Sequence, residues 1–319
     1  MKILVVSSIP TDPLDAGNRA RLVTLIQSLL SDHHDVHIAH IHTVDYDAEA
    51  MARRLGRERV HFLPFLPQPP RLNLAPRLKR IAGRRLRWNS AFLWPLDSWY
   101  DDRFTEMLRA LQQKHEFEVV FVTYVFMSKA FEAFPASCLR VLDTHDRFGQ
   151  RHREFIKAGL RPRWFSTTLE EEERGFRRAD VVLAIQPEEA EDFRRRLGPG
   201  PPSVLNVGHL IAPVEPASPS ARDAAVFLGS SNPINVQGAQ FFIDRVFPLV
   251  RRCRPAFELG LAGSVADELA DARGIVKLGH VDRLRDAFES AMIFVNSVLM
   301  GTGVNIKLLD AFAAGMPCV

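Results

Sequence analysis

The first forty residues dictate a parallel β-sheet. Residues 2–8, KILVVSS, are a short apolar run rich in β-branched residues, which is typical of a fully buried strand. After a loop, leucine and isoleucine recur at helical spacing from Leu22 to Leu30, and a second strand-like segment follows at 35–42. A strand, a helix and a second strand form a βαβ unit, whose two strands run parallel. We therefore expect an α/β fold in which helices cover the faces of a sheet.

The same alternation continues along the chain. Further strand-like segments lie at 116–124, 139–146, 179–186, 202–208, 224–230, 257–263, 275–281 and 292–298. A chain of 319 residues is too long for one ordinary core, and the stretch between the fourth and fifth of these segments is rich in Pro, Ser and Ala. We predict two Rossmann-like domains, 1–208 and 224–319, joined by a linker at 209–223. Because ligands bind beyond the carboxyl ends of parallel strands, a cleft between two such edges is expected.

Composition limits the classes of function. The formal net charge of +3 is too small for a general nucleic-acid binder. Three cysteines (Cys138, Cys253 and Cys318) lie far apart, which fits a reducing compartment and argues against a disulfide framework. No segment reaches the roughly 18 apolar residues of a membrane span, and the first apolar run is too short for a signal peptide. We expect a cytoplasmic protein that contacts a membrane at most peripherally, on its cytoplasmic face.

The last nineteen residues, GTGVNIKLLDAFAAGMPCV, join a glycine-rich turn to an amphipathic helix. Gly301 and Gly303 permit a tight backbone, and the free amides at a helix N-terminus form an anion site. Lys307 adds a positive charge near the turn, and Asp310 lies on the same helix face. A cation and a carboxylate in this order suit a phosphate beside a ribose. The alternative is a plain glycine turn with an exposed Lys–Asp pair, and the pattern alone does not decide between the two.

This stretch resembles the signature G-[ST]-G-x-x-x-K-x-L-E-A-x-A-x-G-x-P-V-V of family 4 glycosyltransferases of GT-B fold. Other segments resemble that family in the same order, namely DAGNRARLVTLIQSLLSDHHDVHIAHI, VLDTHD, RADVVLAIQPEEAEDF and FLGSSNPINVQGAQFFIDRVFPLV. The resemblance implies two Rossmann-like domains that transfer a sugar from a nucleoside-diphosphate sugar to a glycan or lipid-linked acceptor. It also implies retention of configuration, no metal and no other cofactor. Similar proteins continue for several elements beyond this point, so we expect an incomplete second domain whose activity is doubtful.

The resemblance also assigns donor-binding residues in the second domain. Asp310 stands where the family has the second Glu of a Glu–seven residues–Glu motif, and Thr302 stands at the first, a less conservative change. The loop that commonly holds an Arg and a Lys has asparagines here. The implied donor contacts are Ser230, Asn232, Asn235, Gly301, Thr302, Gly303, Val304, Asn305, Lys307 and Asp310.

In the first domain, the resemblance brings the amides of Gly17, Asn18 and Arg19 to the donor phosphates. It gives a role at the reacting centre to His145, with Asp146 beside it, because a His there can hold a sugar hydroxyl or stabilise the leaving phosphate. A lone His at a strand end is more often structural, and that alternative stays open.

The segment 71–88 is basic, contains no acidic residue and has interleaved Leu and Ile. Such a stretch suits an anionic membrane surface or an anionic acceptor. RNA is a competing partner without an accompanying motif, and a solvated face is the third alternative. The predicted contacts are Arg77, Lys79, Arg80, Arg84, Arg85, Arg87 and Trp88.

Two conspicuous clusters receive no function. Five histidines at 33–42 lack a Cys or carboxylate set that would complete a metal site, so no metal is predicted. Four consecutive glutamates at 170–173 are interpreted as a solvated helix start, because adjacent helical side chains point in different directions, and the open alternative is that one of them reaches the cleft.

Two other functions remain open. One is a sugar-nucleotide isomerase of the same fold, which needs additional titratable groups in the cleft. The other is a degenerate, non-catalytic nucleotide-binding protein, a class that Thr302 and the missing Arg–Lys pair favour.

Overall fold

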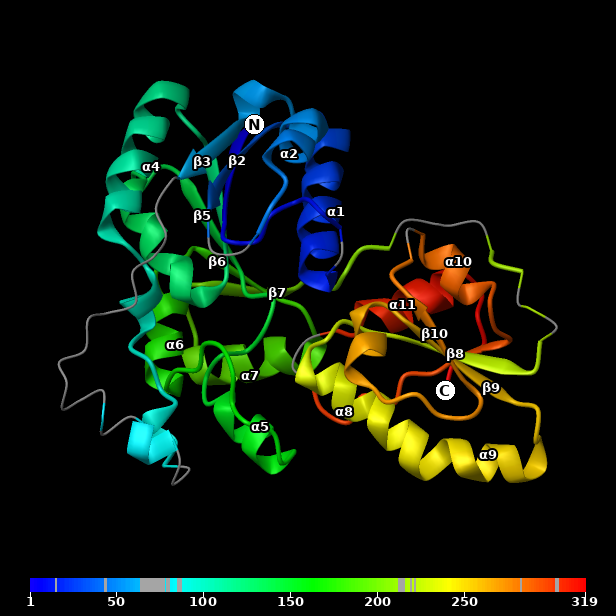
Figure 1. Ribbon diagram of the computed structural model, residues 1–319. Coiled ribbons are helices and arrows are strands. Elements are labelled where there is room, and N and C mark those ends of the chain that lie inside the picture. Colours follow the sequence, from blue (N-terminus) through cyan, green and yellow to red (C-terminus); the bar gives the residue numbers. More distant parts are fainter. Residues whose placement is uncertain are drawn as a thin grey trace. The chain divides into compact units, whose positions relative to one another are not determined.

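The computed structural model describes residues 1–14, 16–42, 45–63, 78, 81–84, 88–211, 216–218, 220, 222–281, 283–301 and 304–319. The chain forms two compact units (Figure 1), the first built from Met1–Leu210 and the second from Ile211–Gly301 and Asn305–Val319. Each is an α/β unit with its own parallel sheet, so the predicted fold class is confirmed. No helix within the described ranges is both long and apolar enough to cross a membrane.

The first unit contains a seven-stranded sheet of order β3-β2-β1-β4-β5-β6-β7, in which every neighbouring pair is parallel. The strands are β1 (Lys2–Ser7), β2 (Asp35–Ile41), β3 (Val60–Leu63), β4 (Val119–Thr123), β5 (Leu139–Asp143), β6 (Val181–Ala184) and β7 (Ser203–Asn206). After β1 the next two strands are added on one side of it, and from β4 onward the strands are added on the other side. In open parallel sheets, ligands bind at the switch point between two such strands, here β1 and β4. All the predicted strands of this unit are present, whereas β3 was not predicted.

Helices cover both faces of this sheet; α1 and α4 lie on opposite sides in Figure 1. The α-helices are α1 (Gly17–Ser31), α2 (Ala48–Leu55), α4 (Asp102–His115), α5 (His152–Lys157), α6 (Leu169–Phe176) and α7 (Pro187–Leu197). The 3₁₀ segments are η1 (Arg57–Arg59), η2 (Asn89–Ala91), η3 (Leu96–Trp99) and η4 (Val125–Ala133). Three of the α-helices begin at side chains that accept a first-turn amide hydrogen bond: Asp47, Asp101 and Thr168.

The interpretation of the glutamate run as fully solvated is wrong for Glu172. Its side chain is completely buried and lies 2.7 Å from the Arg196 guanidinium. It also accepts hydrogen bonds from the amides of Phe148 and Gly149, at 2.6 and 2.9 Å. Burial raises the pKa of Glu172, against the opposing effect of Arg196. The carboxylate therefore fixes the loop that follows β5, which carries the candidate site.

The second unit has a four-stranded parallel sheet of order β10-β9-β8-β11. Its strands are β8 (Ala224–Leu228), β9 (Glu258–Ala262), β10 (Ile275–Gly279) and β11 (Ile293–Phe294). Its helices are α8 (Pro233–Phe241), the π-helical turn η5 (Phe242–Val246), α9 (Phe247–Cys253), the 3₁₀ segment η6 (Ser264–Glu268), α10 (Leu284–Phe288) and α11 (Ile306–Ala313). Alternate residues of β8 enter two different cores, Val226 on one face and Phe227 on the other, as strand geometry requires.

Two ends of this unit are tied by backbone hydrogen bonds. Ala217, within the predicted linker, donates its amide to the carbonyl of Ala314, at 2.9 Å. The predicted strand entry at the C-terminus is present as a parallel bridge between Phe294 and Cys318. Both contacts hold α11, and hence Lys307 and Asp310, against the sheet.

Candidate functional site

The carboxyl edge of the first sheet carries a buried ionic cluster. Asp143, the last residue of β5, is completely buried, and its Oδ1 lies 2.8 Å from Nη2 of Arg21 on α1. Arg21 also donates to the carbonyls of Val207 and Gly208, at 3.0 and 2.9 Å. Although burial acts to raise the pKa of Asp143, His145 and Arg21 outweigh burial and hold that pKa well below its ordinary value. Asp143 is therefore a carboxylate at neutral pH.

His145 lies against this carboxylate in a strained backbone conformation. Its Nε2 is 3.2 Å from Oδ2 of Asp143, and its φ of 55° falls in the left-handed region that non-glycine residues seldom adopt. Strain of this kind persists where the surrounding structure fixes it, and it concentrates at functional sites. An acidic side chain beside an imidazole orients the ring. The arrangement suits a residue that must meet a developing negative charge.

Tyr124 connects His145 to the start of α1. The two rings are 5.1 Å apart, and the Tyr124 hydroxyl accepts a hydrogen bond from Nδ2 of Asn18 at 3.0 Å. Tyr124 follows β4 and also has a positive φ, 67°. Asn18 and His145, both predicted from the sequence, are thus joined at the switch point of the sheet by a residue that was not predicted.

The start of α1 keeps amides available for an anion. Its N-cap, Ala16, provides no side-chain hydrogen bond. In the part of the chain that the structure describes, the amides of Gly17 and Asn18 have no acceptor, whereas the amide of Arg19 donates to the carbonyl of Ala16 at 3.1 Å and to Oδ1 of Asn18 at 3.0 Å. The guanidinium of Arg19 donates to the carbonyls of Pro13 and Asp45 and so holds the loop. Contacts of the Gly17, Asn18 and Arg19 amides with donor phosphates stay predictions.

Asp146 lies on the other side of His145 and is committed to an arginine. Its Oδ2 is 2.9 Å from Nη2 of Arg151, and both side chains are nearly buried. Its Oδ1 accepts the amide of Arg147 at 2.9 Å. These contacts give Asp146 a positioning role in the turn that carries His145. Its predicted role in the reaction stays a prediction.

In the second unit, α11 presents two half-buried charges. Lys307 and Asp310 lie one turn apart on α11, and neither has a hydrogen-bond or ion-pair partner among the described residues. Burial lowers the pKa of Lys307 to about 8 and raises the pKa of Asp310 to about 6. Unpaired buried charges are costly, and perturbed pKa values of this kind are typical of functional sites.

Asn305 fixes the start of this helix. Its side-chain oxygen accepts the amide of Leu308 at 3.3 Å, while its Nδ2 donates to Oδ1 of Asn296 at 2.8 Å. Asn305 is therefore the N-cap and also the link to the end of β11. Val304 is partly exposed and Gly301 exposed; Thr302 and Gly303 lie outside the described residues.

The loop after β8 is held by its own polar side chains. Asn232 caps α8 by accepting the amide of Ile234, at 3.1 Å. Asn235 donates to the hydroxyl and the carbonyl of Ser230, at 3.0 and 3.2 Å. These contacts shape the loop, and donor contacts by the same three residues stay predictions.

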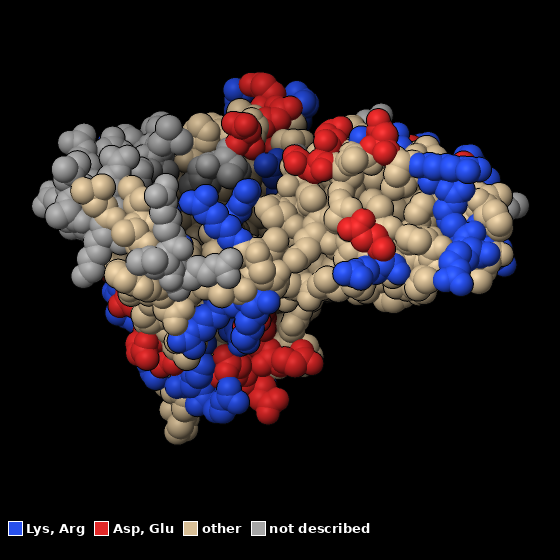
Figure 2. Space-filling model, turned by 60° about the horizontal axis from the view of Figure 1, so that its bottom comes forward, with Lys and Arg blue, Asp and Glu red and all other residues tan. Residues whose placement is uncertain are grey.

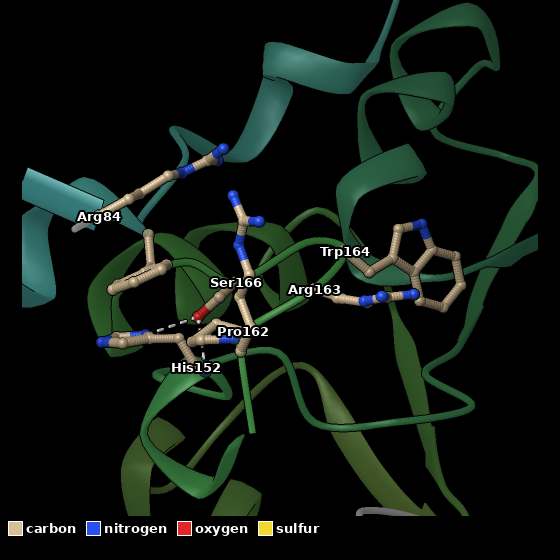
Figure 3. A pocket seen from close by; sticks show the side chains of 8 residues that line it. Arg84, His152, Pro162, Arg163, Trp164 and Ser166 are labelled. Atoms are coloured by element: carbon tan, nitrogen blue, oxygen red, sulfur yellow. Dashed lines mark hydrogen bonds between the residues drawn. The ribbon is translucent and has the colours of Figure 1, made fainter. Parts of the chain in front are cut away.

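The first unit also has a cavity of about 370 Å³ that the sequence did not predict. Three arginines, an imidazole, a hydroxyl and two aromatic rings line it (Figure 3): Arg84, Phe92, His152, Arg161, Pro162, Arg163, Trp164 and Ser166. Burial, and then the charge of Arg161, lower the pKa of Arg84, and no acidic side chain is among the described residues that line the cavity. On the face drawn in Figure 2, Lys and Arg side chains lie in several separate groups on the surface. The cavity differs from such surface groups because it brings three arginines together in a concave site.

The polar wall of this cavity is preorganised. Nδ1 of His152 lies 2.9 Å from the Ser166 hydroxyl, as drawn in Figure 3, and the ring stacks on Phe92 at 5.8 Å. Nε2 of His152 is buried without a hydrogen-bond partner in the described structure. Burial lowers the pKa of His152, so the ring is neutral at pH 7. Trp164 has a φ of 64° and is held among the rings of Tyr124, Phe126 and Phe148.

Comparison with known proteins identifies the second unit. Residues 222–319 match the family of glycosyl transferases group 1. The second unit is a group 1 glycosyltransferase domain. A comparison with curated proteins gave no match for the chain.

Solved structures share the fold of the whole chain. A variant of TarM from S. aureus, in complex with Fondaparinux, alpha-GlcNAc-glycerol and UDP, has a TM-score of 0.64 at 10% identity, over 99% of this chain and 85% of that one. HepE from Anabaena, with UDP and glucose, gives 0.58 at 13% identity, over 100% and 80%. Sucrose-phosphate synthase from Thermosynechococcus elongatus gives a TM-score of 0.60 at 13% identity, over 99% of this chain and 80% of that one. The predicted GT-B glycosyltransferase fold is therefore confirmed.

Some residues of the candidate site have no sequence signal. Arg21 and Tyr124 are isolated in the sequence, and only the sheet topology brings them to His145. The run RPRW at 161–164, in contrast, combines cations with an aromatic residue and could have been noticed. Of the predicted basic segment, Arg84 lines the cavity and Trp88 is half-exposed, whereas Arg77, Lys79, Arg80, Arg85 and Arg87 lie outside the described residues.

Proposed function

We propose that this enzyme transfers a sugar from a nucleoside-diphosphate sugar to a glycan or lipid-linked acceptor, with retention of configuration and without a metal ion. The proposal rests on two half-buried charged side chains, Lys307 and Asp310, which have no hydrogen-bond or ion-pair partner among the described residues. Both lie on the helix that follows the glycine turn, within the segment that matches the family. The structures of HepE with UDP and of TarM with UDP support a nucleoside diphosphate as the donor's leaving group.

The chemistry would be mainly electrostatic. The diphosphate gains negative charge as the glycosidic bond breaks, and groups that bind this charge more strongly in the transition state accelerate the reaction. Lys307, with a pKa of about 8, carries its proton at neutral pH and would bind the diphosphate. The backbone amides at the start of α11 would bind the same diphosphate, because amides at a helix N-terminus form an anion site. Asp310, with a pKa of about 6, is a carboxylate that accepts ribose hydroxyl hydrogen bonds. We assign no nucleophile.

The first unit would bind the acceptor. His145, oriented by Asp143, would hold a sugar hydroxyl or the leaving phosphate. The three arginines of the cavity favour an acceptor that carries phosphate, sulfate or carboxylate groups, because guanidinium groups bind such oxyanions through paired hydrogen bonds. The exposed Trp88 supports a peripheral position at the cytoplasmic membrane face, and the three free cysteines support a reducing compartment.

A thermal-shift screen of nucleoside diphosphates and their sugars tests the donor. At about 100 times its Kd, a ligand of the folded state adds about 2.7 kcal/mol to the free energy of unfolding, which raises Tm by several degrees. We expect one base to give the largest shift. A panel without any shift would refute donor binding. Incubation of the best sugar nucleotide without acceptor separates the classes, since new sugar nucleotides would identify an isomerase.

Removal of a cavity arginine should weaken an anionic acceptor selectively. A charge-assisted hydrogen bond contributes about 1.5–3 kcal/mol, so Arg163→Ala should raise the Kd for dextran sulfate about 10–100-fold. Binding measured by calorimetry should be absent for uncharged dextran. Lys157→Ala, at an exposed lysine of α5, is the matched control and should change nothing. Equal losses in both variants would mean that net charge, and not the cavity, attracts the polymer.

A further inference from the structure

Three histidines from distant parts of the sequence meet in the first unit. His37 is in β2, His61 in β3, and His115 is the last residue of α4 (Figure 1). Because Ala39 pairs with His61 in the sheet, His37 and His61 point to the same face. One ring nitrogen from each of the three lies within 4.8 Å of the others, and Nδ1 of His37 is 3.1 Å from Nε2 of His61.

Two further observations support a bound ion at these histidines. Nε2 of His115 is buried and has no hydrogen-bond partner in the described structure. A buried ring nitrogen without a partner is costly, and a bound ion would satisfy it. Behind His37, Oδ1 of Asp35 lies 3.6 Å from Nε2, the nitrogen that faces away from His61. The same oxygen accepts a hydrogen bond from Nε of Arg59 at 3.1 Å, so Asp35 lies beside the His37 ring without a direct hydrogen bond to it, in the position from which a carboxylate can orient a histidine ligand.

We propose that His37, His61 and His115 bind a divalent transition-metal ion, with Zn²⁺ as the best match. Neutral imidazoles are the preferred nitrogen ligands of zinc, and three of them leave a fourth position for water. At Zn–N distances of about 2.1 Å, tetrahedral ligand atoms are about 3.4 Å apart, so the ring nitrogens need only small side-chain rotations. Phe117, whose ring is 5.3 Å from that of His37 and 5.4 Å from that of His115, packs beside the site.

The surrounding charges indicate a site of moderate affinity. Lys2, Lys114 and Arg59 lie near enough to repel a divalent cation, and Asp35 lies near enough to attract it. We therefore expect a dissociation constant in the micromolar range.

This site is independent of glycosyl transfer. His37 and His61 lie near the beginning of their strands, whereas Asp143 and His145 follow the carboxyl end of β5. Among its neighbours in the sequence, the histidines at 33–42, His37 has no set of ligands that completes a metal site. The partners come instead from β3 and α4. A bound ion would cross-link the edge of the sheet to the helix that covers it.

Calorimetric titration of the untagged, full chain with Zn²⁺ tests the proposal. We expect one equivalent to bind, Tm to rise, and His61→Gln and His115→Gln each to weaken binding at least 10-fold. Co²⁺ should give a d–d absorption band that both variants lose. His33→Asn is the matched control, because His33 is exposed and its φ of 59° is one that Asn accepts. Absence of stoichiometric binding to the wild-type chain would overturn the proposal.

A change at Asp35, which lies beside His37, keeps the test decisive if replacing one of the histidines unfolds the chain. Asp35→Asn retains the shape of the side chain and should weaken Zn²⁺ binding about 10-fold, since loss of a second-shell partner costs about 10–100-fold in affinity. Circular dichroism of each variant confirms folding before titration. Zn²⁺ binding that is equal in wild type, His115→Gln and Asp35→Asn would place the ion elsewhere and overturn the assignment.

Discussion

Replacing Lys307 with alanine should lower the affinity for a nucleoside diphosphate about 10–100-fold, because a hydrogen bond to a charged group contributes about 1.5–3 kcal/mol. The ammonium group has no hydrogen-bond or ion-pair partner in the described part of the chain, so its removal breaks no polar contact there. Turnover should fall further than affinity, since the charge on the diphosphate grows as the bond to the sugar breaks. Isothermal titration and steady-state kinetics measure the two effects.

The pKa values of Lys307 and Asp310 give this prediction a pH signature. Lys307 loses its proton above about pH 8, and Asp310 loses its charge below about pH 6. Both groups are charged only between these values, so kcat/KM should follow a bell-shaped curve with its maximum near pH 7. In Lys307→Arg the cation persists at every accessible pH, and the alkaline limb of the curve should disappear.

Lys277→Ala is the control for both measurements. Lys277 lies in β10 and forms an ion pair with Asp271 at 2.8 Å, so it carries the same charge at another position. We expect its affinity and pH curve to match those of the wild type. If Lys307→Ala binds nucleoside diphosphates as tightly as Lys277→Ala does, the assignment of Lys307 to the diphosphate is wrong.

The sheets were predictable because buried parallel strands are continuous apolar runs. Segments such as those of β1, β4 and β8 have no polar interruption, and flanking loops rich in Gly, Pro and Asp mark their ends. The strand β3 was missed because its four residues, VHFL, include a histidine and follow a charged 3₁₀ turn. Its pairing with β2, and not its own sequence, makes it a strand.

The candidate site was predictable only where one segment carries the chemistry. Lys307 and Asp310 lie on one helix, so periodicity places them together. The cluster of Arg21 with Asp143 joins residues that are more than a hundred positions apart, and no local pattern reports it. The same limit explains Glu172, whose burial is imposed by Arg196 on the next helix. Long-range pairs of this kind follow from topology alone.

Loss of the buried carboxylate should give the largest change in stability. Asp143→Ala leaves the guanidinium of Arg21 buried without a counter-charge, and breaking a buried ion pair in this way costs about 3–5 kcal/mol. At about 2–4 °C per kcal/mol for a unit of this size, Tm should fall by roughly 6–20 °C, measured by calorimetry. His145 loses the carboxylate that orients its ring, so turnover should fall as well.

A double-mutant cycle separates the charge from the packing around it. Arg21→Met/Asp143→Leu removes both charges and keeps much of the apolar volume, so it should be more stable than the single variant Asp143→Leu, in which the charge of Arg21 stays unpaired; Arg21→Met is the other single variant of the cycle. It should not reach wild-type stability, since Arg21 also donates to the carbonyls of Val207 and Gly208. Strict additivity of the two single changes would contradict the coupling inferred here. In that case the pair would merely lie close together, and the position of His145 would have to depend on Tyr124 and the strained turn alone.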